Sequence, residues 1–102
     1  MTDLDIISSG SVKLNKLSYE VEVDGIKVPM RYREFSLLKF FMEHPGEVLT
    51  RTRLLEEVWD RNIFCATNTI DVHVSLLRRK LRSQSFRNHI KTVHCVGYIF
   101  NS

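Results

Sequence analysis

The sequence predicts an α+β fold in which an antiparallel sheet comes first, three helices follow and a β-hairpin ends the chain. Up to about residue 30, short runs rich in β-branched residues partly alternate between apolar and polar side chains. From Glu34 to Leu81, apolar residues instead recur at spacings of three and four, which is typical of amphipathic helices. After residue 90 the alternation returns. The 102 residues suffice for one modest hydrophobic core, so we expect a single domain over residues 1–102.

The sheet is expected to use three runs near the N-terminus. These are VKL at 12–14, SYEVEV at 18–23 and IKVPM at 26–30. Asp24 and Gly25 separate the last two runs, and Asp-Gly favours a two-residue hairpin turn because glycine tolerates the positive φ that such a turn requires. The strands are therefore predicted to pair antiparallel.

Two helices are expected next. Phe35, Leu38 and Met42 mark the apolar face of a helix over residues 33–43, and Pro45-Gly46 ends it. Thr50 is a plausible N-cap for a second helix that stops near Asp60. Its apolar face is supplied by Leu54, Leu55, Val58 and Trp59. Residues 60–67 show no periodicity and are expected to form a loop that carries exposed apolar side chains.

The third helix, capped by Thr67 or Asn68 and running to Arg82, is predicted to have two distinct faces. At 100° per residue, one stripe faces the core and consists of Ile70, Val74, Leu77 and Leu81. The opposite face carries Asn68, Val72, Ser75, Leu76 and Arg79, with Arg82 at its margin. A helix in the major groove of DNA uses these three kinds of side chain, because arginine binds guanine edges and phosphates, Ser or Asn binds base edges, and aliphatic groups contact thymine methyls.

The charge distribution supports a polyanionic partner. Lys and Arg number 6 against 8 acidic residues in residues 1–50, but 9 against 4 in residues 51–102. Between Arg78 and Lys91 there are six basic residues and no acidic one. A merely solvated face usually intersperses both signs, so this distribution favours nucleic acid.

The C-terminal run IKTVHCVGYIF at 90–100 is predicted to form a hairpin whose turn is marked by Gly97. A sheet, three helices and a terminal hairpin together describe a winged helix-turn-helix. Its recognition helix would span residues 68–82 and its wing residues 90–100.

Three segments resemble the OmpR/PhoB-type effector domain of bacterial two-component response regulators. They are EFSLLKFFMEHPGEVLTRTRLLEEVWD at 34–60, TIDVHVSLLRRKL at 69–81 and IKTVHCVGYIF at 90–100. The resemblance implies a four-stranded N-terminal sheet, a third helix in the major groove and a wing at the adjacent minor groove. It also implies double-stranded DNA as partner, tandem copies on repeated half-sites, and a loop at 60–67 that contacts RNA polymerase through Ile63 and Phe64.

On this basis we expect sequence-specific DNA binding that regulates transcription. Base readout is expected from Asn68, Val72, Ser75, Leu76 and Arg79. Phosphate contacts are expected from Arg51, Arg53, His73, Arg78, Lys80, Arg82 and Thr92. His94 is expected at the minor groove, while His73 has the alternative of being packed in the interior.

The chain departs from the family pattern at several positions. Arg31 stands where the family often has Thr, so the capping box with Glu34 is expected to be missing. Asn68 and Leu76 stand where Arg is common, so base preference should differ from that of better-known members. In the wing, His94 and Cys95 replace an Arg and a turn Gly. Histidine is mostly neutral near pH 7, which weakens the expected minor-groove contact.

Other functions are not supported by the residue pattern. We find no nucleophile constellation and no Gly-rich phosphate loop. Among the four histidines and two cysteines, only His94 and Cys95 are close in sequence, and adjacent residues on a strand point to opposite faces. We therefore expect no enzyme, no metal or other cofactor and no small-molecule substrate. No apolar run approaches the roughly 18 residues of a membrane span. The N-terminus lacks a secretion signal, so a cytoplasmic protein with Cys65 and Cys95 as free thiols is expected.

Three alternatives remain open at this point. The fold could serve as a protein-interaction module that binds polymerase or another partner without strong DNA binding. The chain is expected to be the C-terminal part of a longer response regulator, because domains of this size usually occur as separable modules, and a free-standing regulator is the alternative. Finally, Ile63 and Phe64 could fold back onto the core instead of meeting polymerase.

Overall fold

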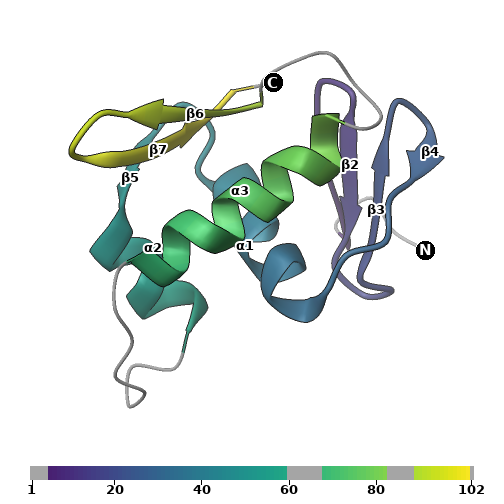
Figure 1. Cartoon of the computed structure of the whole chain (residues 1–102). Helices are drawn as coiled ribbons and strands as arrows, with labels where there is room; N and C mark the ends of the chain where they lie inside the picture. Colours follow the sequence, from purple (N-terminus) through teal and green to yellow (C-terminus); the bar gives the residue numbers. More distant parts are fainter. Residues whose placement is uncertain (1–4, 60–67, 83–88, 102) are drawn as a thin grey trace.

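A computed structural model describes residues 5–59, 68–82 and 89–101, and it contains two antiparallel sheets and three helices (Figure 1). The N-terminal sheet has the order β1-β2-β3-β4, with β1 Ile6–Ser9, β2 Val12–Asn15, β3 Glu20–Val23 and β4 Ile26–Lys27. The turn between β3 and β4 is the predicted one, because Asp24 and Gly25 have φ of 53° and 80°. The strand β1 was not predicted from its own residues, IISS, although the resemblance implied four strands.

The helix α1 spans Tyr32–Glu43 and begins with half of a capping box. The backbone N–H of Arg31 donates to Oε1 of Glu34 at 2.9 Å. A guanidinium has no acceptor atom, so the forward bond from the Arg31 side chain is absent. The prediction that the capping box is missing was therefore wrong for the bond to Glu34, because the donor of that bond is the backbone N–H of Arg31 and any residue except proline supplies it.

The helix α2 spans Arg51–Val58, and its predicted N-cap is confirmed. Thr50 Oγ1 accepts a hydrogen bond from the backbone N–H of Arg53 at 3.1 Å. The helix α3 spans Asn68–Arg82, close to the predicted range. Thr67, the other proposed cap, lies outside the described residues, as does the whole segment 60–67.

The C-terminal hairpin belongs to a three-stranded sheet with the order β5-β7-β6. Its strands are β5 Val48–Thr50, β6 Ile90–Val93 and β7 Gly97–Phe100. The strand β5 was not predicted. The prediction that Gly97 marks the turn was wrong. Gly97 is the first residue of β7 and pairs with Thr50. A Cβ at Gly97 would lie 2.0 Å from the carbonyl oxygen of Leu49, so only glycine allows β5 to approach.

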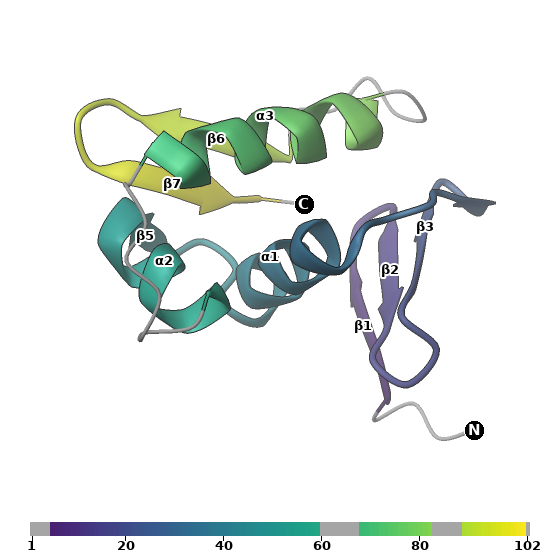
Figure 2. The ribbon, with the colours of Figure 1, turned by 60° about the horizontal axis from the view of Figure 1, so that its bottom comes forward.

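The helices lie between the two sheets, as Figures 1 and 2 show together. One continuous core connects them and includes Leu14 and Val21 from the first sheet, Leu38 and Phe41 from α1, and Phe100 from β7. The four predicted core residues of α3 are all buried, which confirms the orientation of that helix. They are Ile70, Val74, Leu77 and Leu81. The opposite face of α3 is therefore free to meet a ligand.

Candidate nucleic-acid interface

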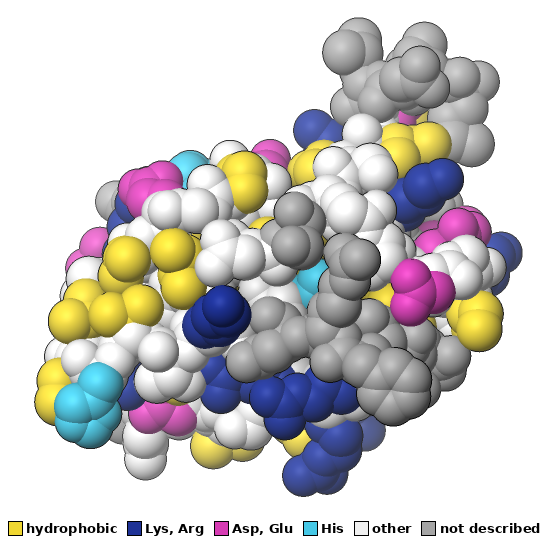
Figure 3. Space-filling view, turned by 90° about the horizontal axis from the view of Figure 1, so that it is seen from above, with side chains coloured by type: hydrophobic (Ala, Val, Ile, Leu, Met, Phe, Trp, Pro, Cys, Tyr) yellow, Lys and Arg dark blue, Asp and Glu magenta, His cyan; other side chains and the backbone are white. Residues whose placement is uncertain are grey.

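The outward face of α3 combines aliphatic and basic side chains. Val72 is 57% exposed and Leu76 is 39% exposed. The remaining residues of this face, Asn68, Ser75, Arg79 and Arg82, are also exposed. Lys and Arg side chains gather along the lower edge of Figure 3, which is the side of the molecule that faces the viewer in Figure 1, where α3 crosses the front. The structure thus brings the five predicted base-reading residues onto one accessible surface.

Arg78 connects α3 to the wing. Its Nε donates to the carbonyl oxygen of Ile90 at 3.0 Å, and Nη2 donates to Thr92 Oγ1 at 2.5 Å. Its guanidinium also lies 5.0 Å from the centre of the Tyr98 ring. Burial lowers the pKa of Arg78, although arginine stays protonated at any ordinary pH. Arg78 and Thr92, both predicted as phosphate contacts, therefore also hold β6 against α3.

A second connection joins α2, α3 and β7 through Asp71. The hydroxyl of Tyr98 and Nε of Arg51 both donate to Asp71 Oδ1, at 2.5 and 2.8 Å. The bond from Tyr98 has the largest effect and lowers the pKa of Asp71; burial opposes it, and the bond and the charge of Arg51 lower the pKa further. Tyr98 has two guanidinium groups near its ring, since Arg51 lies 5.6 Å and Arg78 5.0 Å from the ring centre. We call Asp71, Tyr98, Arg51 and Arg78 the bracket.

Lys80 pairs with a buried carboxylate instead of pointing away from the protein. Its Nζ donates to Glu34 Oε1 at 2.5 Å, and the Glu34 side chain is only 4% exposed. Burial alone would raise the pKa of Glu34, but the bonds from Lys80 and from the N–H of Arg31 outweigh it and the pKa is lowered. The ammonium group is thus part of the contact between α1 and α3.

Two more of the predicted phosphate contacts, Arg53 and His73, also have protein partners. Arg53 forms an ion pair with Glu47 and lies 5.5 Å from the centre of the Phe40 ring. His73 donates from Nδ1 to the carbonyl oxygen of Thr69 at 2.9 Å and meets the Trp59 ring edge-on. The packed alternative for His73 is therefore realised in the unbound domain.

The tip of the wing is exposed. His94, Cys95 and Val96 form the turn between β6 and β7, and Cys95 adopts φ of 63°, a left-handed conformation that favours glycine. Cys95 is a free cysteine, as predicted, whereas Cys65 lies outside the described residues together with Ile63 and Phe64. Within the ranges that the structure describes, no group of three or more potential ligands could hold a metal ion.

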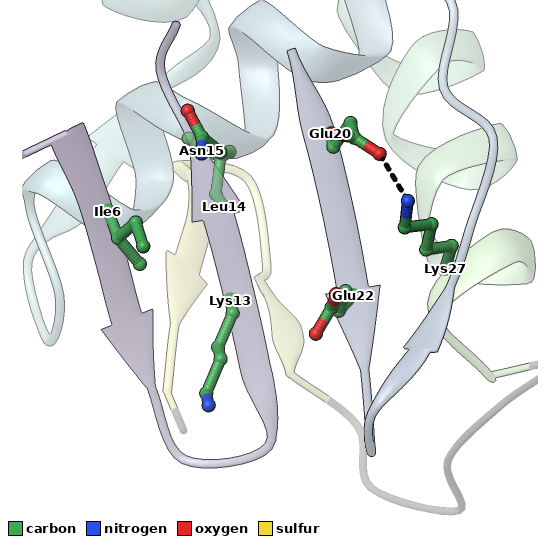
Figure 4. Close-up of a pocket in the computed structure, with 7 residues that line it drawn as sticks. All are labelled: Ile6, Lys13, Leu14, Asn15, Glu20, Glu22 and Lys27. Carbon is green, nitrogen blue, oxygen red and sulfur yellow. Dashed lines mark ion pairs between the residues drawn. The ribbon is translucent and has the colours of Figure 1, made fainter. Parts of the chain in front are cut away.

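A shallow pocket lies on the N-terminal sheet and is lined by residues of β1, β2, β3 and β4. Figure 4 shows Ile6, Lys13 and Glu22 on neighbouring strands, with an ion pair of 2.8 Å between Glu20 and Lys27. Its volume of about 260 Å³ lies below the roughly 300–1,000 Å³ of small-molecule sites, and its rim carries charges of both signs, so it does not suggest such a site. In the part of the chain that is described, no helix is long and apolar enough to cross a membrane.

The sheet, the three helices with an exposed third helix, and the hairpin fixed beside it define a winged helix-turn-helix domain. Residues 25–100 match the family model described as "Transcriptional regulatory protein, C terminal". The chain belongs to this family, which is a family of regulators and not a class of enzymes. Membership confirms the resemblance to OmpR/PhoB-type effector domains that the sequence indicated.

Curated relatives include two regulators. Over 96 residues the chain is 36% identical to the phosphate regulon transcriptional regulatory protein PhoB of Pseudomonas aeruginosa. Over 95 residues it is 39% identical to the response regulator SaeR of Staphylococcus aureus. These matches cover 94% and 92% of this chain but only 42% of either relative. The chain therefore corresponds to less than half of these regulators.

Solved structures share the fold. The response regulator DrrB of Thermotoga maritima, an OmpR/PhoB homologue, superposes with a TM-score of 0.82 at 26% identity, covering 96% of this chain and 45% of that chain. The RstA DNA-binding domain of Klebsiella pneumoniae, solved in complex with the RstA box, gives a TM-score of 0.80 at 29% identity, covering 94% and 96%. The second match covers nearly all of both chains, so this chain has the dimensions of that isolated domain.

The sequence did not indicate three members of the internal contacts, Asp71, Tyr98 and Glu34. Asp71 is the only acidic residue in the third helix, which was a signal that it has a specific partner. Tyr98 belongs to the run at 90–100 that predicted the hairpin, and Glu34 to the capping box that was expected to be missing. No pattern along the chain connects Glu34 with Lys80, because 46 residues separate them.

Replacing Tyr98 with phenylalanine tests the bracket. The variant loses one hydrogen bond to Asp71, and we expect its free energy of unfolding to fall by about 0.5–1.5 kcal/mol, since the half-exposed carboxylate can be hydrated instead. The pKa of Asp71 should rise toward its ordinary value. Because its pKa is lowered in the folded protein, Asp71 stabilises the fold at any pH above its ordinary pKa of about 3.9. This stabilisation is lost as the pH falls from there through the lowered pKa. Denaturation from pH 7 to pH 2 should therefore show a smaller acid loss in the variant, whereas an unchanged acid loss would contradict the role given to Tyr98.

Proposed function

We propose that this domain binds double-stranded DNA in a sequence-specific manner and thereby regulates transcription, with α3 in the major groove and the wing near the minor groove. The observation that supports this function most directly is the outward face of α3, on which Val72, Leu76 and Arg79 are exposed. The apolar residues on the opposite face of the helix are buried in the core. Membership in a family of transcriptional regulators supports this function. A relative of the same size whose structure was solved with a DNA box supports it further.

Base edges would be read by Asn68, Val72, Ser75, Leu76 and Arg79. The direct phosphate contacts would come from Arg82 and from groups that already hold protein partners. Arg51, Arg53 and Arg78 each use one or two of the five N–H donors of a guanidinium in the contacts described above, so further donors can face a phosphate. Lys80, His73 and Thr92 would add contacts at the flanks, and His94 would approach the minor groove.

A salt titration tests this function. Affinity for a random duplex should fall linearly on logarithmic axes as salt is added, with a slope of about −0.9 for each phosphate neutralised. The physical reason is the release of condensed counterions by the basic side chains. Fluorescence anisotropy of a labelled duplex between low and physiological salt measures the slope. Absent duplex binding at low salt, or an affinity that ignores salt, would contradict DNA binding and favour the protein-interaction module instead.

Contact with RNA polymerase is a second proposal, carried by Ile63 and Phe64 between α2 and α3. If these side chains meet polymerase, Phe64→Ala should reduce activated transcription in vitro while DNA affinity and melting temperature stay unchanged. Parallel losses of thermal stability and DNA affinity would contradict the polymerase contact and support packing against the core. Thr52→Ala, an exposed change within α2, serves as a control that should leave transcription unaltered.

We further infer that two copies bind in tandem on repeated half-sites and that the domain acts as the effector part of a longer cytoplasmic regulator. The 42% coverage of PhoB and SaeR supports the second inference. Gel-shift or mass measurements on duplexes with one or two half-sites would give the stoichiometry. Two copies on the longer duplex and one on the shorter are expected.

A further inference from the structure

We propose that Val72 and Leu76 form an apolar ridge that reads the methyl groups of thymine, so that each half-site contains two thymines about two base pairs apart. This inference rests on the proposed DNA binding. It assigns a chemical class of base to the exposed face of α3, whereas the function above requires only that some sequence be preferred.

The ridge consists of two aliphatic side chains one helical turn apart. Val72 and Leu76 are 57% and 39% exposed, although valine and leucine in a helix of this size usually face the core. The core side of α3 is already complete, because Ile70, Val74, Leu77 and Leu81 are buried there. Neither aliphatic side chain is therefore needed for packing of the unbound domain.

Thymine is the base whose major-groove edge fits such a ridge. It presents a C5 methyl group, whereas guanine, adenine and cytosine present only hydrogen-bonding atoms or a bare ring edge there. An aliphatic side chain that covers a polar edge leaves a donor or acceptor without water or a partner, which costs free energy. Val72 and Leu76 should therefore select thymine both by attraction to the methyl group and by exclusion of the other bases.

The charges around the ridge identify DNA, and not an apolar protein surface, as the occupant. Arg79 and Arg82 are exposed on the same side of the helix. No acidic residue occurs between Val72 and Lys91, and Asp71 just before this stretch is bonded to Tyr98 and Arg51. An apolar ridge bordered by one sign of charge matches a groove whose walls are phosphates and whose floor carries methyl groups.

The spacing of the ridge sets the spacing of the thymines. Four residues along a helix span about 6 Å, at a rise of about 1.5 Å per residue. Successive base pairs are about 3.4 Å apart along the duplex. The two side chains therefore reach base pairs separated by about two steps. Each thymine methyl group that is buried against Val72 or Leu76 should strengthen binding about threefold to fivefold.

The test removes methyl groups without altering base pairing. A binding site is first selected from random duplexes with the 102-residue chain, and each thymine is then replaced singly by deoxyuridine, which lacks only the C5 methyl. We expect a loss of about threefold to fivefold at two positions about two base pairs apart, and almost none elsewhere. In Leu76→Ala, uridine at one of these positions should no longer matter, and in Val72→Ala the other position should become insensitive.

Leu17→Ala is the matched control, because Leu17 is 67% exposed but lies in the turn between β2 and β3. It should keep both uridine effects. Unaltered folding of all variants is checked by circular dichroism and melting temperature. If no uridine replacement weakens binding, or if the effects persist in both ridge variants, the inference is overturned while DNA binding stands. Absence of binding to any duplex would overturn the proposed function as well, so the two failures are distinguishable.

Discussion

Replacing Lys80 with alanine is expected to lower the free energy of unfolding by about 1–3 kcal/mol at neutral pH, the range for leaving a buried polar group without its partner. The full cost of breaking a buried ion pair is not expected, because the Lys80 side chain is 33% exposed and water can partly replace it. The Glu34 side chain is 4% exposed and would keep only the N–H of Arg31 as a described donor. The pKa of Glu34 should then rise, since the bond from Lys80 that lowered it is gone while burial, the largest single effect on this carboxyl, remains. Urea denaturation of the two proteins at pH 7 measures the difference.

The pH dependence of Lys80→Ala follows from the same carboxylate. In the natural chain the pKa of Glu34 is lowered, so its carboxylate stabilises the fold at any pH above its ordinary pKa of about 4.3. This stabilisation is lost as the pH falls below that value. In the variant the pKa of Glu34 is raised, so its ionised carboxylate destabilises the folded state at neutral pH. Protonation of Glu34 in acid removes that cost. The difference in stability should therefore shrink below about pH 4.3. Adding Glu34→Gln to Lys80→Ala should recover part of the loss at neutral pH, and a constant difference at every pH would contradict the pairing.

Leu77→Ala is expected to cost about 2–5 kcal/mol of folding stability, the usual result of removing a large aliphatic side chain from a core. Leu77 is fully buried on the inner face of α3. DNA affinity should fall only as far as the protein unfolds. Leu76→Ala is the matched control, because the same change at the neighbouring exposed leucine should shift stability by about 0.5 kcal/mol or less. Equal melting temperatures of the two variants would contradict the assigned faces.

Local patterns along the chain were sufficient to predict the elements that local chemistry determines. The two faces of α3 follow from its period, the cap of α2 from Thr50, and the turn before β4 from Asp24-Gly25. The strand β5 was missed because three residues are too few to show a period in the sequence, and they continue directly into α2. Gly97 was assigned to a turn because its close neighbour, Leu49, lies far away in sequence.

The candidate site was predicted less completely than the fold. Sequence indicated which basic residues lie near α3, but it could not indicate which of them have protein partners. Lys80 and Arg78 meet Glu34 and Thr92, and these contacts depend on tertiary packing between distant segments. Arg79 has a simpler position, since its place opposite the core stripe follows from helical geometry alone. The exposed face of α3, with Arg79 near its centre, is thus the part of the site for which sequence and structure agree.

The affinity of Arg79→Ala for a selected duplex and for a random duplex tests the central claim most directly. Arg79 is exposed, so its loss should change stability by less than about 0.5 kcal/mol. If it binds a guanine edge, specific binding should weaken by about 1–3 kcal/mol and preference at one base pair should relax. If it binds only phosphate, both duplexes should lose affinity equally and the salt slope should fall by about one. An Arg79→Ala domain with unaltered affinity for both duplexes would contradict the account, because α3 could not then face DNA with its outward side.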